Sequence, residues 1–344
     1  SLSSYGEGVT MPIDFTNCPV RNKTYAGANG SKISVIYDGH LYMLKFPSAA
    51  ALNKDMSYAN GCISEYLGCH IFETVGIPVQ ETLLGMYTKN GKEKIVVACR
   101  DFTSSGVVLQ DFASLKNTII DSVHNGYGTE LDDILLAIDS QTAIDPTGLR
   151  TWFWNVFIVD ALIGNWDRHN GNWGFLYHVD TDRMELAPVY DCGSCLFPQA
   201  DESIMRGTLA DPNELNLRIF NIPLSGIRLN NKKINYFDFI SSLEYPDCNA
   251  ALRYIVPKID MAKIDRIIDE TPFISELQRD FYKTVLAARK ERILDYSLEK
   301  LERMSEQTKS ESQPSVISRL KSLSEELQQS HTKTQNKSHD NYSR

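Results

Sequence analysis

Ala161-Leu-Ile-Gly-Asn-Trp-Asp-Arg-His-Asn-Gly-Asn172, followed by Leu186-Ala-Pro-Val-Tyr-Asp-Cys-Gly193, is the part of the sequence that decides the fold. An apolar run ends in a polar loop, and Asp167, Asn172 and Asp191 follow at short spacing. A carboxylate such as Asp167 can accept a hydroxyl proton, while an amide oxygen and a second carboxylate are ligands that Mg²⁺ takes. This set is typical of phosphoryl transfer from a nucleotide. The alternative is an ordinary helix-ending turn, which also uses Asn, Asp and Gly.

Two charged residues upstream fit the same chemistry. Lys45 lies near the end of the apolar run 41–46, where an ammonium group needs anionic partners. Glu65 follows within a predicted helix, in the order of the strand lysine and helix glutamate that pair in kinases. The alternative for either residue taken alone is a solvated surface side chain.

A run of small residues precedes the first predicted strand, and its backbone amides could cover phosphates. The run matches neither a Walker motif nor GxGxxG, so an ordinary turn is the alternative. Its members are Gly27, Ala28, Asn29, Gly30, Ser31 and Lys32.

The hydrophobic pattern predicts an α+β protein whose first hundred residues are strand, strand, helix, strand, strand. The turns Asp38-Gly39 and Asn90-Gly91 each favour a tight hairpin. The rest is mostly helical, apart from a short hairpin within 165–198. The expected strands are 33–37, 40–46, 80–87 and 94–99, and the expected helices are 58–75, 109–122, 130–138, 148–163, 249–256, 260–270 and 274–306.

Composition limits the function classes. The chain has 344 residues and a net charge of -9, which argues against sequence-independent binding of nucleic acid. It shows no signal peptide or membrane span, because the longest apolar run contains Asp160. The 7 cysteines are odd in number and sit within apolar patterns, which favours reduced thiols and a cytoplasmic location. The Cys192-Gly-Ser-Cys195 spacing has no second pair to make a zinc site.

With these residues placed, the sequence resembles the HipA-like Ser/Thr kinase family, which is best known from bacterial toxin–antitoxin systems. The matching pieces occur in the family's order between about residues 24 and 300. They are Ala26-Gly-Ala-Asn-Gly-Ser-Lys32, Leu44-Lys-Phe-Pro47, Ser64-Glu-Tyr-Leu67, Gly76-Ile-Pro-Val79, Leu162 through Asn172, and Leu186-Ala-Pro-Val-Tyr-Asp191.

The resemblance implies a bilobed protein-kinase-like fold that binds ATP and Mg²⁺ in the cleft between a small β-rich N-lobe with one main helix and a helical C-lobe. Asp167 would be the catalytic base, and Asn172 and Asp191 would hold the metal. Lys45 would contact the α- and β-phosphates, with Glu65 as its partner. The remaining ATP-binding candidates are the small-residue loop with Lys32, the hinge residues Cys99, Arg100, Asp101 and Phe102, and also His169 and Tyr190.

The resemblance also implies phosphorylation of a protein Ser or Thr, including autophosphorylation at a residue in or beside the phosphate-covering loop. Thr24 and Ser31 are the candidates. The expected organisation is a loose segment at 1–23, the N-lobe at 24–102, the C-lobe at 103–306 and a polar tail at 307–344. That tail is expected to be partly disordered or to hold one docking helix.

Full-length HipA toxins carry an additional N-terminal subdomain that helps contact a DNA-binding antitoxin. Only about 20 residues precede the loop here, so the sequence is closer to compact, stand-alone members and puts an antitoxin-like partner in doubt. Two other functions stay open. A phosphoinositide kinase shares the Asp-Arg-His-x-x-Asn pattern but should show a basic cluster for membranes, and a pseudokinase would only bind.

Overall fold

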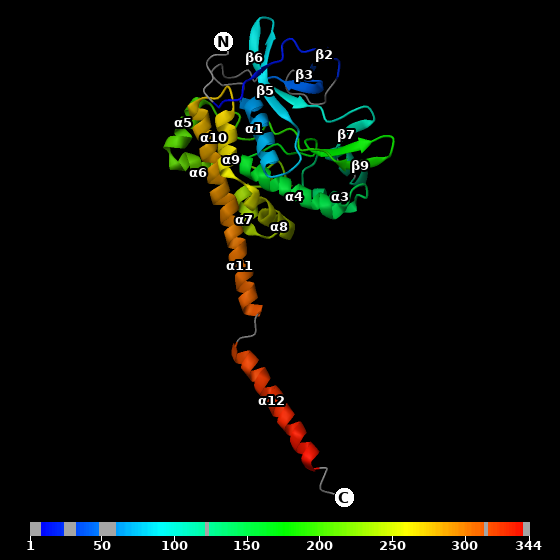
Figure 1. Cartoon of the computed structure of the whole chain (residues 1–344), viewed down its shortest axis with the longest axis vertical. Helices are drawn as coiled ribbons and strands as arrows, with labels where there is room; N and C mark the ends of the chain where they lie inside the picture. The colour runs from blue at the N-terminus through cyan, green and yellow to red at the C-terminus, as the bar shows by residue number, and fades with distance from the viewer. Residues whose placement is uncertain (1–7, 24–31, 48–59, 121–123, 313–315, 340–344) are drawn as a thin grey trace. The chain divides into compact units, whose positions relative to one another are not determined.

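The computed structural model describes residues 8–23, 32–47, 60–120, 124–312 and 316–339. The chain divides into two compact units, Ser1–Leu298 and Glu299–Arg344. The first unit contains every element labelled in Figure 1 except most of α11, Tyr296–Ser312, and all of α12, Val316–His339. The first unit combines a β-rich N-terminal part with a mostly helical remainder, so the α+β fold class is confirmed. The lobe boundaries stay predictions.

A six-stranded sheet forms the N-terminal part, in the order β1-β5-β6-β4-β3-β2. All pairs are antiparallel except β1 with β5. Asp38 and Asn90 both have positive φ, 47° and 50°, as the predicted hairpin turns require. The strands are β1 Ile13–Asp14, β2 Val20–Arg21, β3 Lys32–Tyr37, β4 His40–Lys45, β5 Thr82–Lys89 and β6 Lys92–Arg100.

The expectation of a loose N-terminal segment is wrong for the residues that form β1 and β2. Phe15 is fully buried in the core of the sheet, and the strand β1 lies against Gly85 so closely that a Cβ there would be 2.1 Å from the Ile13 carbonyl oxygen. Two-residue strands carry too little periodicity to stand out in a sequence. The glycine in β5 is what admits this segment to the sheet.

Helix α1, Asn60–Thr74, packs against β5 and β6 of this sheet. It ends before Gly76, whose φ of 79° suits only glycine well, and Pro78 follows. Val79 then forms a bridge with Val189, two residues before Asp191. The helix and its exit therefore connect the sheet directly to the second part of the predicted site.

The remainder of the first unit is mostly helical and also contains two small sheets (Figure 1). The helices are α2 Phe112–Ile119, α3 Leu131–Ser140, α4 Pro146–Ile163, α5 Glu202–Ala210, α6 Pro212–Phe220, α7 Tyr236–Ser242, α8 Pro246–Ile255, α9 Met261–Glu270 and α10 Glu276–Arg289, with short 3₁₀ and π turns at Val256–Lys258 and Lys290–Asp295. The sheets are β7 Val107–Asp111, β8 Gly174–His178 and β9 Arg183–Leu186, and the hairpin β10 Arg228–Leu229 with β11 Lys232–Lys233.

The structure differs from the helix predictions in three places. The region 109–122 begins as β7, because Asp111 caps α2 by accepting a hydrogen bond from the Ser114 amide and so fixes where the helix can start. The short helices α5, α6 and α7 were not expected. The long helix predicted at 274–306 is interrupted by the π turn before α11, Tyr296–Ser312.

The second unit contains most of α11 and the helix α12, Val316–His339. The tail thus contains a helix, α12, on which the apolar residues Val316 and Leu320 are exposed. Among the described residues, no helix is long and apolar enough to cross a bilayer.

Candidate active site

Helix α4 delivers the polar loop that follows it. The helix starts at the Asp145 cap, with Pro146 as its first residue, and ends at Gly164, whose φ of 64° gives a left-handed cap. The amides of Gly164 and Asn165 both donate to the carbonyl oxygen of Asp160. A buried, apolar helix therefore stops at one defined residue and presents residues 165–172 beyond it.

A buried ion pair holds this loop in shape. Asp160 is 1% exposed and Arg168 is 5% exposed, and Arg168 Nε lies 3.0 Å from Asp160 Oδ2. Arg168 Nη1 also donates to the carbonyl oxygens of Asn172 and Tyr190, at 2.9 and 2.5 Å. One guanidinium group thus connects the end of α4, the polar loop and the segment before Asp191.

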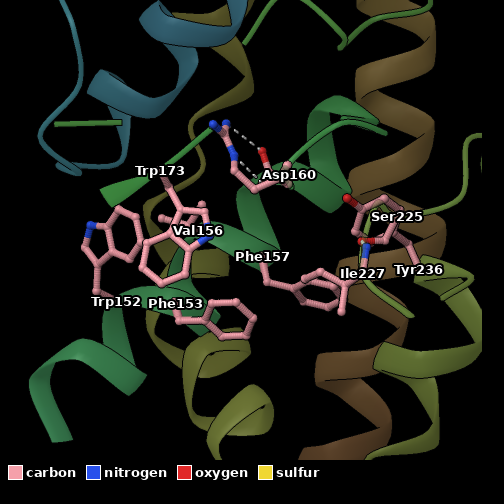
Figure 2. A pocket seen from close by; sticks show the side chains of 10 residues that line it. Trp152, Phe153, Val156, Phe157, Asp160, Trp173, Ser225, Ile227 and Tyr236 are labelled. Carbon is pink, nitrogen blue, oxygen red and sulfur yellow. Dashed lines mark hydrogen bonds and ion pairs between the residues drawn. The ribbon is translucent and has the colours of Figure 1, made fainter. Parts of the chain in front are cut away.

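Aromatic side chains pack near Asp160, close to the end of α4 (Figure 2). Trp152, Phe153, Phe157 and Trp173 surround a cavity of about 10 Å³ beside the ion pair of Asp160, which dashed lines mark in the figure. That volume is at the lower limit for one water molecule. The cavity is therefore part of the packing and has no room for a substrate.

Asp167 lies between two hydrogen bonds made by neighbouring asparagines. Its amide donates to Asn165 Oδ1 at 3.0 Å, and Asn172 Nδ2 donates to its carbonyl oxygen at 2.6 Å. Burial raises the pKa of the Asp167 carboxyl, with a further increase from Asp191, while His169, Arg168 and Lys233 oppose the shift. A carboxylate with a raised pKa is a better proton acceptor than an ordinary aspartate.

Lys45 joins the sheet to the second carboxylate. Its Nζ lies 2.7 Å from Asp191 Oδ1 and 3.3 Å from Glu65 Oε1, so the expected pair with Glu65 on α1 is present. Burial alone would lower the pKa of Lys45, but the two carboxylates outweigh it and the pKa is raised well above its ordinary value. Lys45 is therefore fully protonated at neutral pH.

Asp191 occupies a constrained backbone position. Its φ is 55°, in the left-handed region that is uncommon for residues other than glycine. Burial would raise the pKa of its carboxyl, but Lys45 and Arg168 hold the pKa below the ordinary value. Gly193 permits the backbone after Asp191 to approach the Glu65 side chain closely, since a Cβ on Gly193 would lie 3.0 Å from Glu65 Oε2. This turn therefore presents an ionised carboxylate beside Lys45.

The donor set fits a magnesium ion held together with a nucleotide. Asn172 uses its amide nitrogen within the loop, which leaves Oδ1 as an acceptor, and Asp191 uses one carboxylate oxygen for Lys45. In the described part of the chain, no group of three or more His, Cys, Asp or Glu residues could hold a metal by itself. Mg²⁺ needs only one or two carboxylates when phosphate oxygens and water complete its shell.

The four predicted hinge residues, 99–102, have different surroundings. Cys99 is buried at the end of β6, while the guanidinium of Arg100 binds Glu81 on the sheet surface at 3.0 Å. Asp101 accepts hydrogen bonds from Thr103 and Lys23. The rings of Phe102 and Tyr190 lie 5.9 Å apart. The structure thus brings Phe102 and Tyr190 together and directs the Arg100 side chain elsewhere.

Only some of the remaining predicted residues lie within the described part of the chain. Thr24 and the five loop residues 27–31 lie outside the described residues, so their nucleotide and autophosphorylation roles stay predictions. Lys32 is the first residue of β3, opposite Lys45 on β4. His169 accepts a hydrogen bond from the Gly171 amide at its Nδ1, 3.0 Å away.

The cysteines around α1 are buried free thiols. Cys192 and Cys195 are fully buried, and a Cβ on Gly68 of α1 would lie 2.8 Å from Cys192 Cβ. Burial raises the pKa of Cys195 well above its ordinary value. These properties are typical of structural thiols and do not favour metal or redox use.

The sequence did not reveal the residues that support the loop. Besides Asp160 and Arg168, Asn170 is buried and its Nδ2 donates to the carbonyl oxygens of Gly126 and Gly128, both at 2.8 Å. The only visible signal was one carboxylate, Asp160, inside an otherwise apolar helix. Such a residue needs a buried partner.

Arg168→Met is expected to destabilise the protein strongly. The substitution leaves Asp160 buried without its counter-ion, and breaking a buried pair in this way costs about 3–5 kcal/mol. Urea unfolding of the purified variant measures the loss. Arg150→Met, which removes a surface pair with Asp139, is the matched control and should change the free energy of unfolding by less than about 1 kcal/mol. Equal losses in both variants would contradict the assigned role.

Comparison with known proteins places the chain beside a family of kinases. The model of the HipA-like C-terminal domain matches residues 20–256. The chain is 51% identical over 288 residues to the serine/threonine-protein kinase CtkA of Helicobacter pylori strain J99, a match covering 83% of this chain and 87% of the relative. The crystal structure of a proinflammatory kinase CtkA from Helicobacter pylori matches with a TM-score of 0.81 and 50% identity, covering 86% of this chain and 99% of that one. A Shewanella oneidensis MR-1 complex of HipA, HipB and operator DNA reaches a TM-score of only 0.48 at 15% identity, covering 81% of this chain and 68% of that one.

Proposed function

Because the chain belongs to the HipA-like C-terminal domain family, we propose that it is an ATP- and Mg²⁺-dependent kinase that phosphorylates Ser or Thr of proteins. The observation that carries the proposal is the ion-paired set Glu65–Lys45–Asp191, which lies on three separate segments. The same pairing of a strand lysine with a helix glutamate recurs in protein kinases. The negative charge of Asp191 raises the pKa of the Asp167 carboxyl, so the two carboxylates belong to one site.

Each residue has one role in the proposed reaction. Asp167 accepts the proton of the attacking hydroxyl, and Lys45 neutralises charge on the nucleotide phosphates. Asn172 and Asp191 would hold Mg²⁺, which supplies charge stabilisation for the transferred phosphoryl group. The Arg168 hydrogen bonds to the carbonyl oxygens of Asn172 and Tyr190 keep the metal ligands at a fixed spacing.

Autophosphorylation at Thr24 or Ser31 is part of the same proposal. Thr24 precedes the small-residue loop in sequence and Ser31 belongs to it, and Lys32, next to Ser31, begins a strand paired with the strand of Lys45. We also propose a bacterial source, as for the Helicobacter pylori relative, and a cytoplasmic setting, because the cysteines of the described residues are free thiols.

Incubation with γ-labelled ATP and Mg²⁺ tests the proposal. We expect label on Ser or Thr of the protein itself or of proteins in a lysate, located by phosphosite mass spectrometry. Phosphoinositide vesicles are incubated in parallel, and label found only in lipid would favour a lipid kinase. No labelled product, together with no increase in melting temperature by Mg-ATP, would favour a pseudokinase. Mg-ATP at 100 times its dissociation constant should add about 2.7 kcal/mol to the free energy of unfolding.

A further inference from the structure

The hairpin β10–β11 is attached directly to the polar loop that holds Asp167. Gly226, before β10, lies so close to the loop that a Cβ there would be 3.2 Å from the Trp166 carbonyl oxygen. After β11, the Tyr236 hydroxyl donates to the carbonyl oxygen of Asn165 at 2.6 Å. Both ends of the hairpin are therefore fixed to the same loop, and the hairpin holds a defined place beside it.

A third segment, 124–130, fixes the hairpin from another side. The Arg228 amide donates to the Thr129 carbonyl oxygen at 2.8 Å, and the Asn231 amide donates to Glu130 Oε1 at 2.8 Å. This segment is itself bound to the polar loop through the side chain of Asn170. The three segments together form one connected surface next to Asp167.

Two cations face each other on this hairpin. Arg228 and Lys233 are directly opposite in the antiparallel register, so their side chains share one face, while Leu229 and Lys232 share the other. Like charges at opposite positions of a strand pair are destabilising. The Arg228 Nη1 donates to the Asn231 carbonyl oxygen at 3.0 Å, and in the portion of the chain that the structure describes no carboxylate forms an ion pair with Arg228 or Lys233. The Glu130 carboxylate nearby already accepts a bond from the Asn231 amide.

The shared face of Arg228 and Lys233 belongs to a hairpin that contacts the loop of Asp167 at Trp166 and Asn165. Lys233 is one of the charged side chains that lower the pKa of Asp167. Trp166, next to Asp167 in the loop, is 38% exposed, and Tyr127 of the third segment is 52% exposed. Exposed aromatic side chains beside a fixed charge are common in surfaces that bind another protein. This combination fits a polypeptide that brings a negative charge near the acceptor hydroxyl.

We propose that Arg228 and Lys233 bind an acidic side chain that flanks the acceptor residue of the protein substrate. The anion replaces the repulsion of two opposed cations with two charge-assisted hydrogen bonds, and so positions the acceptor hydroxyl at Asp167. The inference rests on the proposed protein kinase function and adds the substrate class, an acidic Ser or Thr peptide. The sequence around Thr24 and Ser31 has lysines at 23 and 32, so neither of these residues presents the favoured acidic neighbour in the adjacent position.

Peptide kinetics on the full chain test this inference. Three synthetic peptides share one Ser acceptor and carry Glu, Ala or Lys at the flanking positions. We expect kcat/KM to be at least about tenfold higher for the Glu peptide than for the Lys peptide, the effect of about one charge-assisted hydrogen bond. Lys233→Glu should invert the order of the Glu and Lys peptides, and Lys233→Gln should reduce the difference, since Arg228 keeps its charge.

Lys232→Glu is the matched control, because it makes the same charge change on the same strand but on the opposite face. It should leave the ratio between the Glu and Lys peptides unchanged. The inference is overturned if the wild-type protein phosphorylates the three peptides equally, if the Lys232 and Lys233 variants change the ratio alike, or if Lys233→Glu lowers kcat equally for all peptides. That last result would place Lys233 at the transferred phosphate instead. Failure of all peptides and of autophosphorylation would count against the proposed kinase function itself.

Discussion

Asp191→Asn is expected to reduce phosphoryl transfer by about 10³-fold or more. The substitution keeps the size of the side chain but removes the charge that lies 2.7 Å from Lys45 and that would hold Mg²⁺. Removing a single neutral donor to a developing charge already costs about 10²–10³ in rate. Initial rates of autophosphorylation and of peptide phosphorylation measure the loss.

A binding measurement separates loss of the metal from loss of the fold. ATP with Mg²⁺ should raise the melting temperature of the wild-type protein more than ATP alone does. For Asp191→Asn, the increase in melting temperature should be the same with and without Mg²⁺. Asp180→Asn, an exposed aspartate in the turn between β8 and β9, is the matched control and should behave like the wild type. Activity that survives in Asp191→Asn would refute its assigned role.

The N-terminal hairpins and the long helices were predictable because their signals are local. Asp38-Gly39 and Asn90-Gly91 specify tight turns by themselves, and both turns are present with positive φ. Helix α4 was also visible, since an apolar run of that length followed by Gly164 has few other interpretations. By contrast, β1 contains two residues, and its place in the sheet depends on Gly85, about seventy positions away.

The charged residues of the site were predictable as a set, but their support was not. Lys45, Glu65 and Asp191 carry charge in apolar surroundings, and charge there needs explanation even in a sequence. Arg168 lies between two predicted site residues, yet its role depends on acceptors in three different segments: Asp160 of α4, Asn172 of the polar loop and Tyr190 before Asp191. Such contacts depend on how the segments pack, and the spacing of residues in the sequence does not predict them. For the same reason the basic face of the hairpin β10–β11 became visible only in the structure.

Asp167→Asn is expected to reduce phosphoryl transfer by about 10²–10⁴-fold, the usual contribution of a positioned general base. Below its pKa the carboxyl carries a proton and cannot accept another. Because burial raises this pKa above the ordinary value of 3.8, kcat/KM of the wild-type protein should fall on the acid side at a higher pH than for an ordinary aspartate. A pH–rate profile of peptide phosphorylation measures this limb, and an acid limb at or below 3.8 would contradict the assignment.

Asp167→Asn should lose activity without losing stability, and this combination distinguishes a catalytic role of Asp167 from a structural one. A carboxyl whose pKa is raised on folding binds its proton more tightly in the folded state, so its contribution to stability falls as the pH rises above the ordinary value. At neutral pH the ionised Asp167 therefore disfavours folding, and Asp167→Asn removes that effect. We expect the variant to melt at the same temperature as the wild type or higher at pH 7, while Arg168→Met melts lower. A large loss of stability in Asp167→Asn would mean that the carboxylate supports the fold and that its activity loss says nothing about proton transfer.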